Sequence, residues 1–271
     1  MPYLDRAGIS IYYDVIEGPD GKPPLLLSHG YGASSAMWGP NVAALAADRP
    51  VITWDMRGHG RSDSPDDPEQ YSHAACVADM AALLHAAGAE RAVLGGLSLG
   101  GFLSLEFVLE HPDRVDAVML FDTGPGYRSD QPRQQWNDRA FKTADRLERD
   151  GIAALGASAE ADYGHRSARG LALAARGMLA QRDGRVIESL PAVKVPVLVL
   201  VGARDKAFLP AAEYISAKIP GAVRVVVPDA GHMSNADQPS LFNQSVLQFL
   251  SSAQPGSAAP SRAAGPPAPA R

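Results

Sequence analysis

Short apolar runs alternate with longer amphipathic segments over most of the chain. The short runs predict six β-strands, at Leu25–Leu27, Val51–Trp54, Ala92–Leu97, Val115–Phe121, Val197–Val201 and Val223–Val227. Several of these runs are apolar at consecutive positions, which is typical of parallel strands that are covered by helices on both faces of the sheet.

The longer segments have the periodicity of helices. Ser72–Ala87, Leu99–Glu110 and Asp237–Ser251 each repeat apolar residues at helical spacing, and we expect Leu109 and Leu241 on the apolar faces of the last two. Strands that alternate with helices predict an α/β fold with a mostly parallel central sheet, flanked by helices and joined by right-handed crossovers.

Residues 123–192 interrupt this alternation, because they are polar, rich in arginine and contain no convincing strand. Apolar residues recur there at helical spacing, so we expect a helical cap inserted over one end of the sheet. The predicted organisation is a core in two parts, residues 1–122 and 193–251, separated by the cap at 123–192. Residues 252–271 hold no large apolar side chain and are rich in proline and alanine, which predicts a disordered tail.

Composition narrows the classes of function. The 271 residues are 46% hydrophobic, enough for a substantial core, and the net charge of −5 with no basic run argues against a nucleic-acid partner. The chain shows no signal peptide and no apolar stretch long enough to span a membrane, so we expect a cytoplasmic protein. Cys76 is the single cysteine and fits a small buried side chain in a helix better than a reactive thiol.

The sequence predicts neither a metal site nor a bound cofactor. No group of histidine, cysteine and carboxylate residues has metal-ligand spacing. The glycines at Gly100 and Gly101 lack the lysine of a phosphate-binding loop.

The segment Gly96-Leu97-Ser98-Leu99-Gly100 carries the strongest chemical signal. It follows a predicted strand and begins a predicted helix, which is the setting in which Gly-x-Ser-x-Gly forms a sharp turn that exposes the serine hydroxyl. The small residues let strand and helix approach closely, and the helix N-terminus adds unpaired N–H groups near the serine.

Five segments together resemble the α/β-hydrolase superfamily in its order along the chain. They are Ser28–Gly32, Asp55–Asp63, Gly96–Gly101, Gly202–Asp205 and Gly231-His232, each at the carboxyl end of a predicted strand. That edge is where open α/β sheets bind ligands. The likeness to small bacterial esterases, enol-lactonases and C–C bond hydrolases covers nearly the whole chain except the tail.

The resemblance implies a triad in the order nucleophile, acid, histidine. Ser98 matches the nucleophile, Asp205 the acid and His232 the base, which removes the serine proton and is itself oriented by the acid. Asp122 is an alternative acid, because some branches of the superfamily place the acid after that strand. If Asp205 is the acid, we expect Asp122 to cap the turn over residues 122–126.

Acyl transfer also requires donors for the oxyanion that forms on the carbonyl. The resemblance implies the backbone N–H groups of Tyr31 and Leu99 for this role. The segment Asp55–Asp63 is expected to brace the site. Four aromatic residues are candidates for the wall of a substrate pocket, namely Trp38, Trp54, Tyr127 and Trp136.

The function that this resemblance implies is hydrolysis of a small carboxylic ester or lactone through an acyl-enzyme, with no cofactor. Serine at position 98 argues against epoxide and halide chemistry, which uses aspartate there. One alternative is a C–C bond hydrolase of ring-cleavage products. Another is a ligand receptor or signalling protein on a hydrolase scaffold that turns over slowly.

Overall fold

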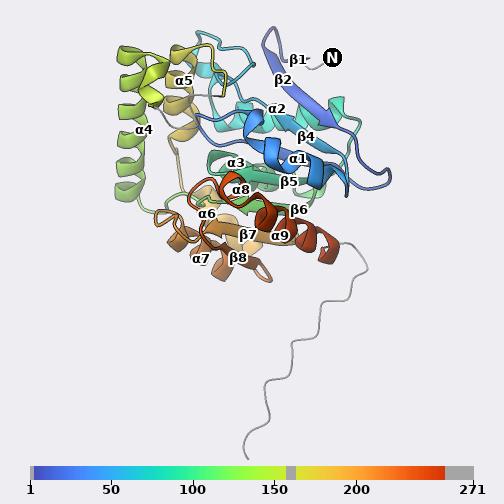
Figure 1. Cartoon of the computed structure of the whole chain (residues 1–271). Coiled ribbons are helices and arrows are strands. Elements are labelled where there is room, and N and C mark those ends of the chain that lie inside the picture. Colours follow the sequence, from blue (N-terminus) through green and yellow to red (C-terminus); the bar gives the residue numbers. More distant parts are fainter. Residues whose placement is uncertain (1–2, 157–162, 254–271) are drawn as a thin grey trace, which may run out of the picture.

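A computed structural model of the chain describes residues 3–156 and 163–253. Eight strands form one sheet in the order β1-β2-β4-β3-β5-β6-β7-β8 (Figure 1). They are β1 (Tyr3–Asp5), β2 (Ser10–Ile16), β3 (Leu25–Ser28), β4 (Val51–Trp54), β5 (Ala92–Leu97), β6 (Val115–Phe121), β7 (Val197–Gly202) and β8 (Val223–Val227). β1 and β2 pair antiparallel with their neighbours, whereas β3 to β8 are parallel.

The six strands predicted from the sequence are confirmed, and β1 and β2 were not predicted. β2 buries only Ile11 and Tyr12 fully, while Val15 on the same strand is 42% exposed. A strand that is mostly exposed needs no continuous apolar run, and β1, the edge strand, has only three residues. The hydrophobic pattern is therefore weak at the edge of the sheet that β1 and β2 form.

The α-helices of the described residues are α1 (Gly39–Ala46), α2 (His73–Ala86), α3 (Leu99–Glu110), α4 (Asp130–Asp150), α5 (Ala168–Ala174), α6 (Arg185–Ser189), α7 (Leu209–Lys218), α8 (Ser234–Asp237) and α9 (Pro239–Ser252). Short 3₁₀ turns are η1 (Ser35–Trp38), η2 (Pro68–Gln70), η3 (Pro112–Arg114), η4 (Ile152–Leu155) and η7 (Leu190–Ala192), and η6 (Ala175–Leu179) is a π-helical turn.

Helices cover both faces of the sheet (Figure 1). One face packs against η1, α1 and α9, where Trp38 and Phe242 are fully buried. The other face packs against α2, α3 and α7, with Leu83, Phe107 and Ile215 at its centre. The sheet is thus the middle of three layers, and its parallel strands direct their carboxyl ends to a single edge.

The helix predicted over Asp237–Ser251 is confirmed as α9, which begins two residues later than predicted. Gln238 has φ −137° and ψ 62°, outside the helical region. Proline disfavours helical backbone at the residue before it, so α9 begins at Pro239. Leu241 and Leu109, both expected on apolar faces, are 39% and 38% exposed.

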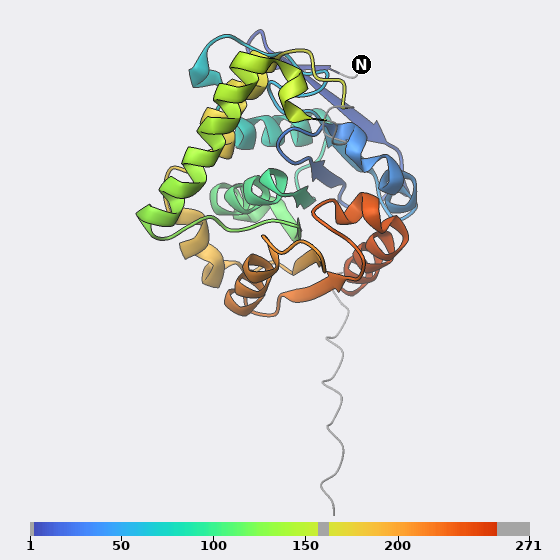
Figure 2. The same cartoon turned by 60° about the vertical axis from the view of Figure 1, so that its left-hand side comes forward.

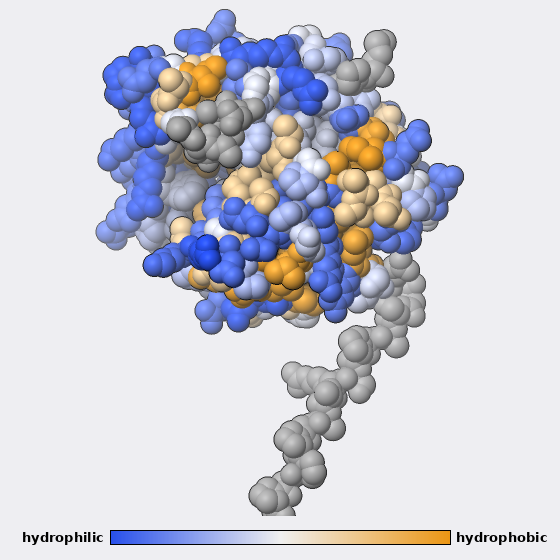
Figure 3. All heavy atoms as spheres, viewed as in Figure 1, coloured by the Kyte–Doolittle hydropathy of each residue, from blue (hydrophilic) through white to orange (hydrophobic). Residues whose placement is uncertain are grey.

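The described residues of the segment 123–192 form helices and no strand. α4 and α5 enclose a small apolar cluster of their own, made of Ala144, Leu147, Leu171, Ala172 and Ala175. Figure 2 shows α4 crossing in front of the strands with α5 behind it, and Figure 3 shows the outer side of α4 as hydrophilic. α6 and η7 instead pack into the main core through Val186 and Leu190.

The tail prediction falls mostly outside the described residues. Ser252, its expected first residue, is the last residue of α9, and residues 254–271 lie beyond the described part of the chain. Within the described ranges, every helix is too short or too polar to cross a membrane.

Candidate active site

Ser98 lies in a strained turn between β5 and α3. Its backbone has φ 53° and ψ −115°, a conformation that residues other than glycine rarely adopt. The turn is held from both sides, because the Ser98 N–H donates to the Phe121 carbonyl at 2.9 Å and the Thr123 hydroxyl donates to the Ser98 carbonyl at 2.5 Å. Strain that the surroundings maintain in this way is typical of functional sites.

The glycines around Ser98 allow the close approach that the sequence predicted. A Cβ at Gly96 would lie 2.2 Å from the Gly100 backbone, and a Cβ at Gly100 would lie 2.1 Å from the Ser28 carbonyl oxygen. Neither position can hold a larger residue unless the backbone shifts. The N-terminus of α3 is therefore seated directly against β5 and the end of β3.

Asp205 and His232 meet at the same edge of the sheet. Asp205 follows β7, His232 follows β8, and the His232 Nδ1 lies 2.7 Å from the Asp205 Oδ2. An ionised carboxylate only accepts hydrogen bonds, so Nδ1 carries the proton and Nε2 of the neutral ring is the acceptor nitrogen. The ring of Phe208 stacks on His232 with centroids 4.9 Å apart and an interplanar angle of 24°.

Asp122, the alternative acid, is fully buried at the end of β6 with φ 45°. Its Oδ1 accepts the Gly202 N–H at 2.8 Å and its Oδ2 accepts the Ser234 hydroxyl. The carboxylate therefore joins the ends of β6 and β7 to α8, and the predicted role of capping the turn over residues 122–126 is wrong. Burial raises the pKa of Asp122 to about 7.

The segment that contains Tyr31 lies beside Ser98. A Cβ at Gly30 would be 3.5 Å from the Ser98 Cβ, so the two loops are in contact. Leu99 is buried at the first position of α3, where a helix leaves its N–H groups without intrahelical partners. Both residues that the sequence predicts as oxyanion donors are thus near the serine, and their N–H role remains a prediction.

A cavity of about 250 Å³ opens at Ser98. Its lining comes from the Ser98 turn, the loop after β6, α4, the end of η6 and α7, and comprises Ser98, Leu99, Phe102, Thr123, Gly124, Pro125, Gly126, Tyr127, Trp136, Arg139, Met178, Leu179, Gln181, Ala207, Phe208 and Ala211. Arg139 is the one charged residue in this lining, within the ranges the structure describes.

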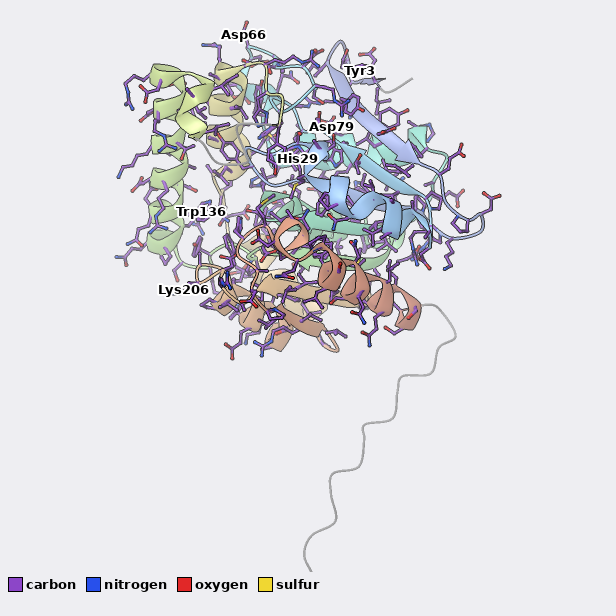
Figure 4. The ribbon with its side chains drawn as sticks, viewed as in Figure 1. Tyr3, His29, Asp66, Asp79, Trp136 and Lys206 are labelled. Carbon is purple, nitrogen blue, oxygen red and sulfur yellow. The ribbon has the colours of Figure 1, made fainter. Side chains whose placement is uncertain are left out.

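Two of the four predicted pocket aromatics line this cavity, Tyr127 and Trp136. Figure 4 shows Trp136 on the side of α4 that faces the strands, and its indole N–H donates to the Leu179 carbonyl at 2.8 Å. Trp38 and Trp54 were wrong candidates, because both are fully buried in the core.

Sequence reasoning missed Phe208, Arg139 and Gln181. Phe208 lies three residues after Asp205, and that proximity was a usable signal. Gln181 is tied to α4 by two hydrogen bonds of 2.8 Å between its backbone and the Asn137 side chain, and its Oε1 is buried without a partner in the described structure. No motif marks Arg139 or Gln181, because only the packing of the insertion brings them to the cavity.

The predicted bracing role of Asp55–Asp63 agrees with its contacts. The Asp55 carboxylate accepts the backbone N–H of Ser35 at 2.6 Å and of Arg61 at 2.8 Å. Arg57 forms a bidentate pair with the fully buried Asp79, at 2.7 and 2.9 Å. These buried bonds hold the loop Asp55–Asp63 in place.

The single cysteine and the metal-binding residue types add no further site within the described residues. Cys76 is buried as predicted, and burial raises the pKa of its thiol well above the usual value. Histidine, cysteine and carboxylate side chains nowhere gather in threes in a way that could hold a metal ion within residues 3–156 and 163–253.

Known proteins are similar to this chain in sequence and fold over most of its length. The chain is 29% identical over 256 residues to a Bacillus subtilis (strain 168) protein named for 2-succinyl-6-hydroxy-2,4-cyclohexadiene-1-carboxylate synthase activity, covering 87% of this chain and 93% of that protein. It is 29% identical over 260 residues to 3-oxoadipate enol-lactonase 1 of Acinetobacter baylyi, covering 88% and 92%. A thermophilic esterase from Thermogutta terrifontis superposes with a TM-score of 0.79 at 27% identity, covering 93% and 97%.

The family described as "alpha/beta hydrolase fold" matches residues 23–173, which include the strands β3 to β6, the Ser98 turn and most of the helical insertion. This match extends over more than half of the chain, and the expected fold class is confirmed. The chain therefore belongs to the alpha/beta hydrolase fold family.

Proposed function

We propose that this protein is a serine hydrolase that cleaves a small carboxylic ester or lactone through an acyl-enzyme on Ser98. The observation that carries the proposal is the 2.7 Å hydrogen bond between His232 and Asp205, next to the cavity that contains Ser98. Phe208 supports this arrangement, since it lines the cavity with Ser98 and stacks on the His232 ring. Relatives named as an enol-lactonase and an esterase agree with the class of reaction.

In the first step the Ser98 hydroxyl oxygen attacks the substrate carbonyl while the His232 Nε2 takes its proton. Asp205 accepts the Nδ1–H of His232, which keeps Nε2 available as the base and stabilises the imidazolium that forms. The strained backbone of Ser98 supports the same role, because it presents the hydroxyl at the N-terminus of α3.

The negative charge that develops on the carbonyl oxygen requires donors that are already in place. The N–H groups of Leu99 and Tyr31 would hold this oxygen. The tetrahedral adduct then collapses: the C–O bond to the leaving alcohol breaks, and His232 returns the proton to that oxygen. In a lactone the leaving alcohol stays attached to the acyl group.

Water repeats the sequence on the acyl-enzyme. His232 removes a proton from the water molecule, the hydroxide adds to the acyl carbon, and the bond to the Ser98 oxygen breaks as the serine regains a proton. The carboxylic acid then leaves. The helices α4 and α5 would act as a cap over this chemistry and exclude bulk water.

The cavity limits which substrates fit. Its volume of about 250 Å³ is at the small end for ligand sites, and its walls are mainly aromatic and aliphatic. Arg139 is the charged group of the lining, and no ion pair is found for it among the described residues. We infer a preference for short acyl groups, and for substrates whose far end carries a carboxylate that Arg139 can contact.

A panel of short p-nitrophenyl esters and lactones, assayed with wild type, Ser98→Ala and Asp205→Asn, tests the proposal. Turnover that disappears in Ser98→Ala supports it. Turnover that survives in Ser98→Ala would show that another group performs the chemistry. A wild type that turns over no acyl substrate would contradict the proposed function.

A further inference from the structure

The residues around Tyr31 form a tight β-turn from Gly30 to Ala33. The Ala33 N–H donates to the Gly30 carbonyl at 3.2 Å, and Gly32 has φ +73° at the third position, where a turn of this kind favours glycine. The fully buried His29 also donates from Nδ1 to the Gly30 carbonyl at 2.7 Å, since its Nε2 accepts the Met56 N–H at 2.9 Å.

These bonds fix the direction of the Tyr31 N–H. The Gly30 carbonyl and the Tyr31 N–H belong to one peptide plane, and all peptide bonds of the described structure are trans. In a trans peptide the two groups point in opposite directions. Donors that hold the carbonyl on one side therefore turn the N–H to the other side.

The helical insertion supplies a second set of bonds to the same turn. His165 donates from Nε2 to the Gly32 carbonyl at 2.9 Å, because its Nδ1 accepts the Gly60 N–H at 3.0 Å. The Tyr31 hydroxyl donates to the Leu171 carbonyl in α5 at 2.9 Å. The insertion thus contacts both the side chain of Tyr31 and the peptide between Gly32 and Ala33.

Ring packing joins these contacts into one cluster. His59 is fully buried, with its ring centroid 5.1 Å from that of His29, 5.4 Å from that of Tyr31 and 5.7 Å from that of His165. Burial lowers the pKa of His29 to about 4 and that of His59 well below its usual value, so both rings are neutral near pH 7. Figure 4 shows His29 in the interior of the molecule, where the cluster lies.

We propose that His165 is a positioning residue for the oxyanion turn. Its Nε2–H holds the Gly32 carbonyl, and the N–H of the same peptide, that of Ala33, closes the turn on the Gly30 carbonyl. This chain of bonds sets the direction of the Tyr31 N–H. The insertion consequently controls the rate of the chemical step as well as the shape of the pocket, an inference that rests on the proposed function.

The two ring nitrogens of His165 can be tested separately. Gln places an amide N–H where Nε2 lies and keeps the bond to Gly32, whereas Asn places an oxygen where Nδ1 lies and keeps only the bond from Gly60. Removing an oxyanion donor outright costs about 10²-fold to 10³-fold in kcat, so a misdirected donor should cost about tenfold. We expect His165→Ala and His165→Asn to lower kcat about tenfold with KM nearly unchanged, and His165→Gln to retain most of the wild-type kcat.

The measurement is kcat and KM on one short p-nitrophenyl ester, with thermal unfolding of each variant and with Ser98→Ala as reference. A residue that only stabilises the fold would change the unfolding temperature of the Asn and Gln variants without separating their kcat values. Equal kcat in wild type and in a folded His165→Ala would overturn the proposal. If that variant does not fold, the comparison of His165→Asn with His165→Gln carries the test, and equal kcat in these two variants would overturn the proposal.

Failure of the proposed function would look different. Turnover by the wild type that Ser98→Ala does not abolish, or no turnover at all, would remove the oxyanion turn from the chemistry and overturn this inference together with the proposed function. Turnover that depends on Ser98 but is indifferent to His165 would overturn the inference alone.

Discussion

Asp122 makes the stability of this protein depend on pH between about pH 4 and pH 7. The side chain is fully buried, and its pKa rises from 3.8 to about 7 because burial penalises the ionised form. Below pH 4 the carboxyl is protonated in both the folded and the unfolded chain. As the pH rises, the unfolded chain loses its proton first, so the free energy of unfolding falls until the folded carboxyl ionises near pH 7.

The size of this effect follows from the pKa difference. Each pH unit between the two pKa values lowers the free energy of unfolding by about 1.4 kcal/mol, so raising the pH from 5 to 8 costs about 3 kcal/mol. Asp122→Asn removes the titration and keeps an oxygen for the Gly202 N–H, while its new amide N–H can donate to the Ser234 hydroxyl. The variant should therefore gain about 3 kcal/mol relative to wild type over that interval.

Urea unfolding of wild type and Asp122→Asn at pH 5 and at pH 8 measures the difference. Asp20→Asn is the matched control, since Asp20 is exposed in the loop between β2 and β3 and makes the same change of charge. The control should follow wild type at both pH values. Parallel pH profiles for wild type and Asp122→Asn would refute the reasoning, because they would mean that Asp122 ionises with equal ease in the folded and unfolded chain.

The other predictions concern activity and a buried ion pair. Asp205→Asn should lower kcat by about 10³-fold to 10⁴-fold with little change in KM, as expected when the amide no longer selects the working tautomer of the base; a loss below tenfold in steady-state assays would contradict this. Arg139→Gln should lower kcat/KM about tenfold for carboxylate-bearing esters and leave neutral esters unchanged, whereas Arg146→Gln on the outer side of α4 should affect neither. Asp79→Ala leaves the buried Arg57 without its carboxylate and should cost about 3 to 5 kcal/mol in urea unfolding, a loss that would be absent if the pair were dispensable.

The sequence was most informative where a strand is buried on both faces. The bounds of the buried strands β4, β5 and β6 agree residue for residue with the apolar runs that predicted them. The bounds of β8 agree as well although it is an exposed edge strand, because four of its five residues are valine. β1 and β2 lie at an edge, where half of each strand contacts solvent and the pattern loses its contrast. α9 begins at Pro239, two residues after the predicted start, because proline disfavours helical backbone at the residue before it. Helical periodicity alone does not give this boundary.

The site was predictable to the extent that motifs lie at strand ends. Ser98, Asp205 and His232 follow β5, β7 and β8, and parallel strands bring such ends to one edge. Arg139 and His165 come from the insertion, whose side chains reach the site only through the packing of α4, α5 and their neighbours. Their positions depend on tertiary contacts that no local pattern of residues encodes.

The most direct test of the central claim is intact-protein mass spectrometry after reaction with a fluorophosphonate, followed by peptide mapping, on wild type, Ser98→Ala and His232→Ala. An activated serine is required for this reaction. If Ser98 is the nucleophile and His232 its base, wild type carries one adduct, mapped to Ser98, Ser98→Ala carries none, and His232→Ala is labelled much more slowly. Wild type that stays unmodified, or an adduct that maps to another residue, would contradict it.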